Sequence, residues 1–400
     1  SFMGFSNWGY WTHHDDAGQY FTSTITENDF NGNYNGMAGL HTNGSTVTGN
    51  VISGLQGNGM DRKEAAISVI HPVDSDEEAV ITNNRIIDCE DINGIWVEAM
   101  NGRVNNNEVD ITIWDYISRA GIVFENSGNS GGMMEAHRNE IMMRDGNGLE
   151  IVNSTVRSFY NYIYTVGYYF GDRAAVLLEG ADGYLATNMI MGNNATGILL
   201  DGARGIECYY NSINIFFDID EEDNNKGKHD ETLGKGSFGN YAVFFYETNR
   251  DLLTKNKENR DETMQGQPSN ATFMRNIIYN TDDGTPIGGP NIGILNSDYN
   301  NLYSEGSNFD LEGWQSQGYD PNSVSIPVQY AGNTDLHLLQ YDPRLYVDNP
   351  LGLENEELEA EFQDYDWDDE FRTFYYFGVD NLYPQVEIID HPERVVDCAG

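Results

Sequence analysis

Hydrophobic and polar residues alternate along this chain in short runs that return at a regular interval. Within each run, two apolar residues flank one other residue, as in Ile95 and Val97 or Ile122 and Phe124. Each run spans about four to six residues, is bounded by Gly, Asn or Asp, and shows no helical periodicity. The repeat unit is therefore predicted to contain strands and turns only, with Trp96 and Glu98 pointing away from the core.

The first apolar residue of each run marks the interval between repeats. The markers are Leu40, Ile67, Ile95, Ile122, Leu149, Val176 and Ile198, separated by 27, 28, 27, 27, 27 and 22 residues. A period in this range indicates a solenoid, in which each coil buries its apolar face against its neighbours. The prediction is an all-β fold: a single-stranded, right-handed parallel β-helix with projecting loops and an irregular C-terminal cap. Each coil would advance the axis by about 4.8 Å.

Asparagines mark one corner of each predicted coil. They are Asn28, Asn50, Asn84, Asn107, Asn139, Asn161, Asn188 and Asn211, with Asn276 and Asn301 resuming the series after an interruption. Asparagine tolerates turn conformations, and its amide carries both donors and an acceptor. Stacked asparagines would therefore bond to one another along the axis, which is a structural role.

The repeat predicts one long domain. Coils are expected over residues 1–304, with a loop-rich insertion at 214–270 in which 241–246 forms a strand. Residues 305–400, where the repeat fades, are expected to form terminal coils and an acidic cap. The chain opens directly in a strand-like segment, so we expect a mature or excised portion of a longer secreted protein.

Charge limits the partners that this chain can have. It holds 64 acidic and 21 basic residues, for a net charge of −43. That balance disfavours nucleic acid and anionic membranes, and membrane insertion is not expected. It suits either a cation-binding, cell-surface protein or a merely solvated acidic surface. The cysteines, Cys89, Cys208 and Cys398, have the spacing of neither a disulfide framework nor a zinc site.

Carboxylates recur three residues after the markers. They are Glu98, Glu125, Glu179 and Asp201, with Val152 in the intervening coil. Stacked pairs would be candidate Ca²⁺ ligands, the only cofactor considered, or an acid and a base acting on a glycosidic bond. The favoured alternative is that these strand-end carboxylates point into water.

Basic and aromatic residues accompany the same strands. The basic residues are Arg62, Lys63, Arg119, Arg144 and Arg173, and the aromatic residues are Trp96, Trp114, Tyr168, Tyr169 and Phe170. Together they would grip and stack an acidic polysaccharide. In an enzyme, the catalytic candidates would be Glu98, Glu125, Arg119, Arg144 and Arg173. The favoured alternative is local ion pairing with Asp61, Glu64, Asp145 and Asp172.

The coil pattern over residues 28–304 resembles the right-handed parallel β-helix proteins of the pectate-lyase-like superfamily. That superfamily includes polysaccharide lyases, glycoside hydrolases, tailspikes and non-catalytic surface proteins. Near the C-terminus, 366–372 (DWDDEFR) and 377–380 (FGVD) resemble the close of secreted β-helix proteins from Bacteroidetes-type bacteria. The match is degenerate, because Asp369 stands where Gly is usual, Val379 where Ala is usual and Asn381 where Glu is usual.

Catalytic signatures of the superfamily are missing. The chain has Asn280-Thr281-Asp282-Asp283 but no later Gly-His-Gly or Arg-Ile-Lys, so no catalytic role is carried over. The sequence thus predicts a non-catalytic extracellular module of a cell-surface or secreted protein, structural or adhesive, with glycan or Ca²⁺ binding. Its partners would be polysaccharide, cell-surface components, other copies or other parts of a surface assembly. The alternative is a polysaccharide lyase or glycoside hydrolase acting in a groove along the helix.

Overall fold

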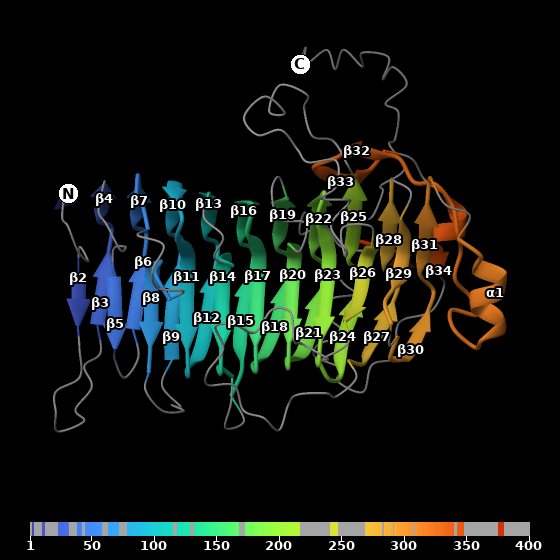
Figure 1. The fold of residues 1–400 in the computed structure, drawn as a ribbon, viewed down its shortest axis with the longest axis horizontal. Coiled ribbons are helices and arrows are strands. Elements are labelled where there is room, and N and C mark those ends of the chain that lie inside the picture. Colours follow the sequence, from blue (N-terminus) through green and yellow to red (C-terminus); the bar gives the residue numbers. More distant parts are fainter. Residues whose placement is uncertain are drawn as a thin grey trace, which may run out of the picture.

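The computed structural model describes seventeen segments of the chain. They are residues 2–3, 10–12, 23–31, 38–41, 45–57, 63–71, 78–114, 118–128, 132–167, 173–216, 241–246, 269–281, 284–290, 292–306, 309–339, 342–347 and 375–379. From β1 to β31, successive strands belong in turn to three sheets, and neighbouring strands within a sheet are parallel and three positions apart in the sequence (Figure 1). The predicted parallel β-helix is confirmed.

Each sheet runs the length of the solenoid. Sheet A contains β1 (Phe2–Met3), β4 (Asp29–Asn31), β7 (Val51–Ser53), β10 (Arg85–Glu90), β13 (Glu108–Thr112), β16 (Glu140–Arg144), β19 (Tyr162–Val166), β22 (Met189–Asn193), β25 (Ser212–Phe216), β28 (Ile277–Asn280) and β31 (Asn301–Ser304). Sheet B contains β2 (Tyr10–Thr12), β5 (Ala38–His41), β8 (Ala65–Ile70), β11 (Asn93–Glu98), β14 (Ala120–Glu125), β17 (Asn147–Val152), β20 (Ala174–Glu179), β23 (Thr196–Asp201), β26 (Tyr241–Tyr246) and β29 (Thr285–Gly288). Sheet C contains β3 (Ser23–Thr26), β6 (Ser45–Thr48), β9 (Glu78–Thr82), β12 (Asn101–Asn105), β15 (Met134–His137), β18 (Thr155–Phe159), β21 (Asp182–Ala186), β24 (Ile206–Tyr209), β27 (Ala271–Met274) and β30 (Ile294–Asp298).

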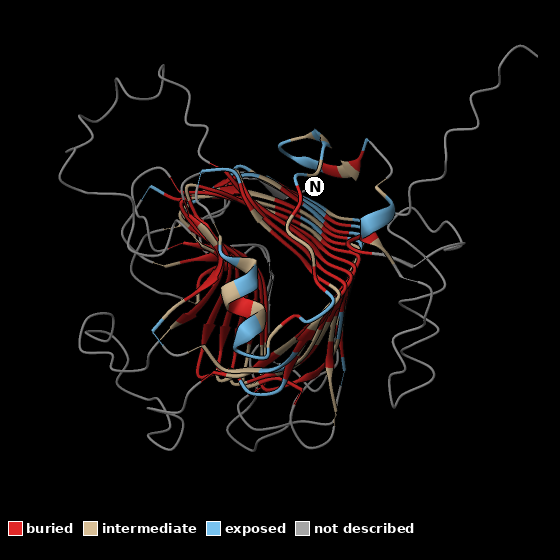
Figure 2. Ribbon diagram, turned by 90° about the vertical axis from the view of Figure 1, so that its right-hand side faces the viewer, coloured by how far each residue is buried: buried red, intermediate tan, exposed pale blue. Residues whose placement is uncertain are grey.

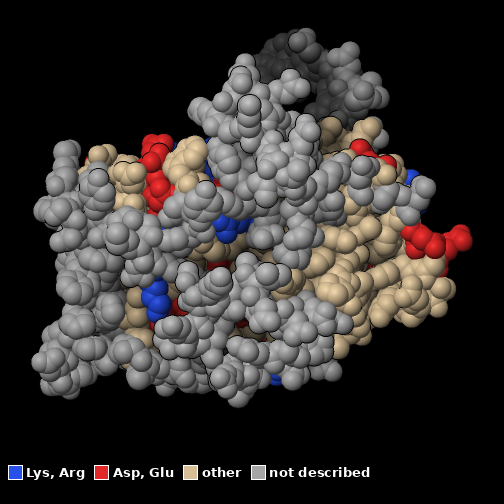
Figure 3. All heavy atoms as spheres, in the orientation of Figure 1, with Lys and Arg blue, Asp and Glu red and all other residues tan. Residues whose placement is uncertain are grey.

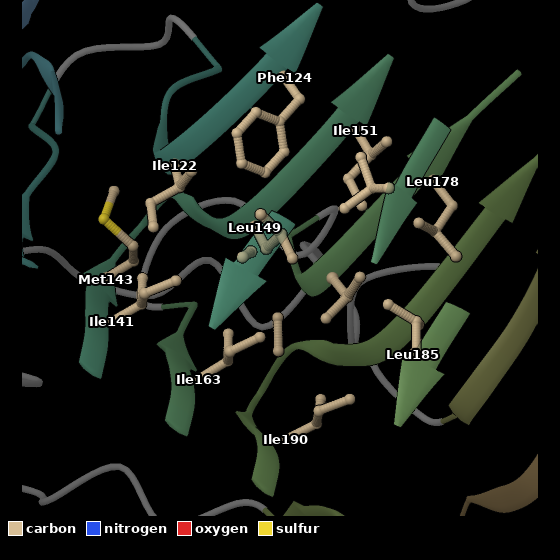
Figure 4. Packing of buried hydrophobic residues seen from close by; sticks show 14 of the residues in the cluster. Ile122, Phe124, Ile141, Met143, Leu149, Ile151, Ile163, Leu178, Leu185 and Ile190 are labelled. Atoms are coloured by element: carbon tan, nitrogen blue, oxygen red, sulfur yellow. The ribbon is translucent and has the colours of Figure 1, made fainter. Parts of the chain in front are cut away.

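The core is a continuous stack of aliphatic residues inside the three sheets. Ile95, Ile122 and Leu149 pair in register on β11, β14 and β17 and are completely buried. Figure 4 shows Ile122 and Leu149 meeting Ile141 and other side chains from sheet A across the interior. The predicted markers therefore form one inward column. Such burial stabilises a coil only when a neighbour is present on each side.

The marker Leu40 was placed two residues too late. Ala38 pairs with Ile67, whereas Leu40 pairs with Val69. A strand of period two offers two inward positions, at Ile67 and Val69, and both are apolar in most coils. The hydrophobic pattern therefore sets the face of a strand but does not distinguish these two positions.

Every turn from sheet C to sheet A consists of two residues. The first has a positive φ in all ten turns, between 52° at Thr187 and 67° at Gly49. The second is an asparagine in all ten. The last ladder residue is Asn300, not Asn301 as the sequence pattern suggested, because Asn301 is already the first residue of β31.

The asparagines bond along the axis as predicted. Each side-chain amide donates to Oδ1 of the asparagine in the next coil, at distances such as 2.9 Å from Asn139 to Asn161 and 3.0 Å from Asn161 to Asn188. The same Oδ1 also accepts the backbone N–H of the preceding asparagine, as in Asn161 N to Asn188 Oδ1 at 3.0 Å. The corner thus satisfies backbone groups that the sheets leave unpaired.

A short helix closes the C-terminal end of the core. Helix α1 (Leu311–Ser316) lies across the end of the three sheets in Figure 2, and its Trp314 packs into the core cluster. The carboxylate of Asp320, fully buried, accepts hydrogen bonds from Trp314 Nε1 (2.8 Å) and from Asn300 Nδ2 (2.8 Å). The asparagine ladder therefore ends on this carboxylate.

The chain then returns over the outside of sheet A. The elements are β32 (Tyr330–Gly332), β33 (Asp335–Leu338), a 3₁₀ turn at Pro343–Leu345, β34 (Tyr346–Val347) and β35 (Tyr375–Tyr376). Leu336 and Val379 cover Met189, Met191 and Phe216 on the outer face of β22 and β25. Figure 1 shows β32 and β33 above this end of sheet A. Sheet A is therefore apolar on both faces here, whereas the outer residues of β10, β13 and β16 include Arg85, Glu108 and Glu140.

Candidate functional site

The outer face of sheet B differs from the outer faces of the other two sheets. Every residue of β17, β20 and β23 is buried, including those that point away from the core. The connections that enter and leave this sheet are also the long ones. Residues 217–240 lead into β26 and residues 247–270 lead out of it, whereas each turn from sheet C to sheet A has two residues. Insertions are thus confined to the two edges of sheet B.

The predicted carboxylates line up on this face. Glu98 pairs in register with Glu125, and Glu179 pairs with Asp201. Val152 lies between the two pairs, opposite both Glu125 and Glu179. Glu179 is 7% exposed and Asp201 is 2% exposed, so the expectation that these strand-end carboxylates point into water is wrong for this pair.

Glu98 belongs to a compact group with Lys63 and Trp96. Lys63 Nζ lies 2.5 Å from Glu98 Oε2, and Trp96 Nε1 donates to the same oxygen at 3.4 Å. The ammonium also lies 5.9 Å from the centroid of the Trp96 ring, within range of a cation–π contact. The side chains of Lys63 and Glu98 are 43% and 17% exposed, so this group is reachable from solvent.

The two tryptophans proposed as stacking surfaces differ sharply. Trp96 is only 1% exposed and packs against Ala65, Ala120 and Val123. It therefore cannot offer a ring face to a sugar. The prediction of Trp96 as a stacking surface was wrong because it treated a side chain that points away from the core as exposed to solvent. Trp114, two residues after the end of β13, is 54% exposed, and its backbone N–H donates to Asp91 Oδ1 at 2.6 Å. Trp114 is the accessible aromatic residue beside the face.

Arg119 forms a buried ion pair that spans two coils. Its Nη2 lies 3.4 Å from Glu64 Oε2, and the two side chains are 0% and 5% exposed. Both residues immediately precede a strand of sheet B, Glu64 before β8 and Arg119 before β14. Between them lies Asn93, whose Nδ2 donates to the Glu64 carbonyl at 2.8 Å and whose Oδ1 accepts from the Ala120 N–H at 2.8 Å. Breaking a buried pair of this kind leaves an uncompensated charge, which is strongly destabilising.

The remaining basic candidates are placed differently. Arg173, 7% exposed, precedes β20 and so continues the edge defined by Arg119. Arg144 instead ends β16 on sheet A, where its Nη1 contacts Asp110 Oδ1 at 2.9 Å. It is therefore not part of the sheet B edge. Lys63, Arg119 and Arg144 contact Glu98, Glu64 and Asp110, each one or two coils away. Of the partners expected from local sequence, Glu64 is thus paired with the distant Arg119, and Asp61 and Asp172 lie outside the described residues.

Several predicted residues fall outside the described part of the chain. They are Arg62, Tyr168, Tyr169, Phe170, Asp61 and Asp172.

Sequence reasoning missed the buried amides and one buried carboxylate of this face. Asn147 donates to Glu150 Oε2 at 3.1 Å and accepts from the Ala174 N–H at 3.1 Å. Asn93, two coils earlier, accepts the equivalent bond from the Ala120 N–H at 2.8 Å. The signal was present in the sequence as Asn93-Gly94 and Asn147-Gly148, each at the start of a sheet B strand.

The structure also places the candidate metal ligands and two of the three cysteines. No group of three or more His, Cys, Asp or Glu side chains among the described residues is placed to hold a metal ion. Each of the pairs Glu98–Glu125 and Glu179–Asp201 offers two carboxylates, while Ca²⁺ takes six to eight oxygens. Cys89 and Cys208 are buried free cysteines, the Cys89 thiol donates to the Ile87 carbonyl at 3.3 Å, and burial raises the pKa of the Cys89 thiol to about 12.

Membrane-spanning helices and similarity to known proteins were both sought. Within the described segments, no helix has the length and apolar character needed to cross a bilayer. No family model matches the chain, and no curated protein and no solved structure matches it either.

Proposed function

We propose that this protein is a carbohydrate-binding β-helix module of a secreted or cell-surface protein, and that it binds at the part of the outer face of sheet B where Lys63 and Glu98 reach solvent, beside Trp114. The observation that carries the proposal is the confinement of long connections to the two edges of this sheet. Loops mounted on a rigid scaffold are where binding residues concentrate. The ten two-residue turns between sheets C and A leave no comparable variation on that side.

The chemistry of the face suits a hydroxyl-rich polymer. Lys63 and Glu98 are partly exposed, and together they offer charged donors and acceptors to hydroxyl groups. Trp114 adds an exposed apolar ring at the edge. Figure 3, which has the orientation of Figure 1, shows blue basic and red acidic atoms adjoining in the middle of the molecule.

Binding can be tested with a panel of neutral and acidic polysaccharides, using affinity electrophoresis and titration calorimetry. Lys63→Ala and Trp114→Ala are expected to weaken binding by about tenfold each, if each removes one charge-assisted or stacking contact worth roughly 1 to 1.5 kcal/mol. The matched control is Arg85→Ala, an exposed cation on sheet A whose partner is Glu108. Equal losses in all three variants, or no binding to any polymer, would reject the proposal.

The extracellular setting and the relationship to pectate-lyase-like proteins are part of this proposal. They rest on the coil repeat, on the acidic composition and on the likeness of 366–372 and 377–380 to secreted β-helix proteins. Surface labelling of intact cells with an antibody, with and without permeabilisation, tests the location. Calorimetry with Ca²⁺ on the wild type and on Glu98→Gln tests the cation-binding part.

Cleavage of a polysaccharide is the second candidate, and one observation favours it. Glu98 and Glu125 occupy paired positions on adjacent strands. Strands lie about 4.8 Å apart, close to the separation of about 5 to 5.5 Å between the two carboxyl groups of retaining glycosidases. Assays for new reducing ends and for unsaturated products separate the candidates. Turnover that disappears in Glu125→Gln while binding persists would establish an enzyme, whereas binding without product would establish a lectin-like role.

A further inference from the structure

Sheet C carries a column of alternating charges on its outer face. Arg103 on β12 pairs in register with Glu135 on β15, Glu135 with Arg157 on β18, and Arg157 with Tyr184 on β21. Arg103 is exposed, and the other three are partly exposed. The face is independent of the proposed carbohydrate face, because it belongs to a different sheet.

In the part of the chain that the structure describes, no ion pair joins neighbouring members of this column. Glu135 accepts a hydrogen bond from Asn105 Nδ2 at 3.0 Å, although an arginine flanks it on each side. Among the described residues, Nε of Arg157 is buried and has no hydrogen-bond partner. A guanidinium held in this way costs free energy unless a further acceptor approaches it. The Nε atom itself has no exposed surface, so an acceptor from outside the chain reaches only the partly exposed remainder of the Arg157 side chain.

The position of the column within the sheet identifies the partner. Strands β15 and β18 are the fifth and sixth of the ten strands of sheet C. A two-fold axis between them, parallel to the strands, would superpose all ten strands on those of a second copy. This axis would place Glu135 of each copy opposite Arg157 of the other copy. It would also place Arg103 of each copy opposite Tyr184 of the other copy. We propose that the outer face of sheet C is the interface of an isologous dimer of this chain, in which helix axes run antiparallel.

Charge supports this choice of face. The chain as a whole has a net charge of −43, which opposes self-association. At the centre of the face, on β12, β15, β18 and their corners to sheet A, the outward charged residues are three arginines and one glutamate (Arg103, Arg138, Arg157 and Glu135), while Glu78 on β9, Asp182 on β21 and Glu207 on β24 lie farther from the centre. Because salt screens charges beyond about 8 Å at physiological ionic strength, these local groups dominate the contact. A second copy meets less repulsion here than on an average part of the surface.

The available area is sufficient for a stable contact. Ten strands spaced about 4.8 Å apart, with four residues each at about 3.3 Å, give a face of roughly 43 Å by 13 Å. That is about 600 Å² per copy and about 1,200 Å² in total, the lower limit for a specific complex. Arginine and tyrosine, both in the column, are enriched among residues that dominate binding energy.

Sedimentation equilibrium of the full chain tests the dimer by charge exchange. Arg157→Glu and Glu135→Arg each bring like charges together twice, so each is expected to raise the dimer dissociation constant about tenfold or more. The double variant Glu135→Arg/Arg157→Glu restores both pairs and is expected to return to within about threefold of the wild type. Arg85→Glu on sheet A is the control and should leave the dissociation constant unchanged. Circular dichroism confirms that each variant folds.

Three outcomes would overturn the dimer. The wild type could remain monomeric at the highest concentration reached, or the folded double variant could stay as weak as the single variants. Alternatively, a carboxylated polysaccharide could bind the monomer and be lost in Arg157→Glu, which would make the face a ligand surface. None of these outcomes depends on Lys63 or Trp114, so failure of the dimer and failure of the proposed carbohydrate face are distinguishable.

Discussion

The side-chain amide of Asn161 donates to Oδ1 of Asn188 at 3.0 Å, and the same oxygen accepts the backbone N–H of Asn161 at 3.0 Å. Both residues are completely buried. Asn161 Nδ2 also donates to the carbonyl of Ala136 at 2.8 Å. One side chain thus connects three consecutive coils, and a buried polar column runs beside the aliphatic core.

Asn161→Ala is expected to destabilise the protein by about 3 kcal/mol or more, because it removes the acceptor of the backbone N–H and of one side-chain N–H of Asn139 and a donor to the Ala136 carbonyl, at about 1 to 3 kcal/mol each. The other side-chain N–H of Asn139 keeps its bond to the Val104 carbonyl at 2.7 Å. The measurement is the shift of the urea unfolding curve. Asn296→Ala is the matched control, since Asn296 is exposed on β30 and should change stability by no more than about 0.5 kcal/mol. Similar shifts in both variants would show that the ladder contributes little.

Arg119→Met is expected to cost about 3 to 5 kcal/mol, because the carboxylate of Glu64 would stay buried without its cation. The double variant Arg119→Met/Glu64→Gln should be more stable than Arg119→Met, and thermal unfolding of the four proteins in this cycle measures the coupling. The exposed pair Arg85–Glu108, with side chains 54% and 39% exposed, provides the comparison. Removing Arg85 should change stability much less than removing Arg119, because solvent screens an exposed ion pair. A double variant less stable than Arg119→Met would contradict this account.

Glu140→Gln is expected to change how stability depends on pH. Partial burial raises the pKa of Glu140 above its ordinary value, repulsion from Glu108 adds to the rise, and Arg85 opposes it. A carboxyl whose pKa is raised by folding loses stability as pH rises from the unfolded value, about 4.3, through the folded one. The melting temperature of Glu140→Gln should therefore match that of the wild type near pH 4 and exceed it at pH 7. A constant difference across this range would rule out the titration of Glu140 as its source.

The sequence was sufficient to predict the coils and the asparagine ladder, because both repeat. Ile95, Ile122 and Leu149 fixed the inward face, and Asn84 to Asn211 fixed one corner. The register of Leu40 was lost, since two inward positions per strand carry the same kind of residue.

The partners within the candidate site could not be obtained in the same way. Glu64 and Arg119 meet because connections of different lengths bring two coils into register, and sequence separation does not report this. The burial of Trp96 depends on what packs against the outside of sheet B, and the alternation of apolar and polar residues along a strand does not predict that packing. Leu336 packs on the outside of sheet A but lies after the point where the sequence repeat fades, so the repeat could not predict its position.

Asp320→Asn is expected to loosen the C-terminal end of the solenoid without disturbing its middle. Asp320 Oδ2 accepts from Trp314 Nε1 (2.8 Å), and Oδ1 accepts from Asn300 Nδ2 (2.8 Å). Neither nitrogen can accept a hydrogen bond, so either orientation of the substituted side-chain amide sets its NH₂ against a donor. The cost is about 1 to 3 kcal/mol, and it falls on the last coil because each coil contacts only its neighbours.

Hydrogen exchange measured along the chain can separate this local loosening from general destabilisation. Amides of 311–324 should exchange faster in Asp320→Asn, whereas those of β16, β19 and β22 should keep their protection. Asp310→Asn is the matched control, because Asp310 caps α1 by accepting from the Gly313 N–H at 2.9 Å and asparagine caps helices about equally well. Uniformly faster exchange in Asp320→Asn would mean that the solenoid unfolds as one unit. Unchanged exchange at 311–324 would mean that the packing of Trp314 closes the core without the carboxylate.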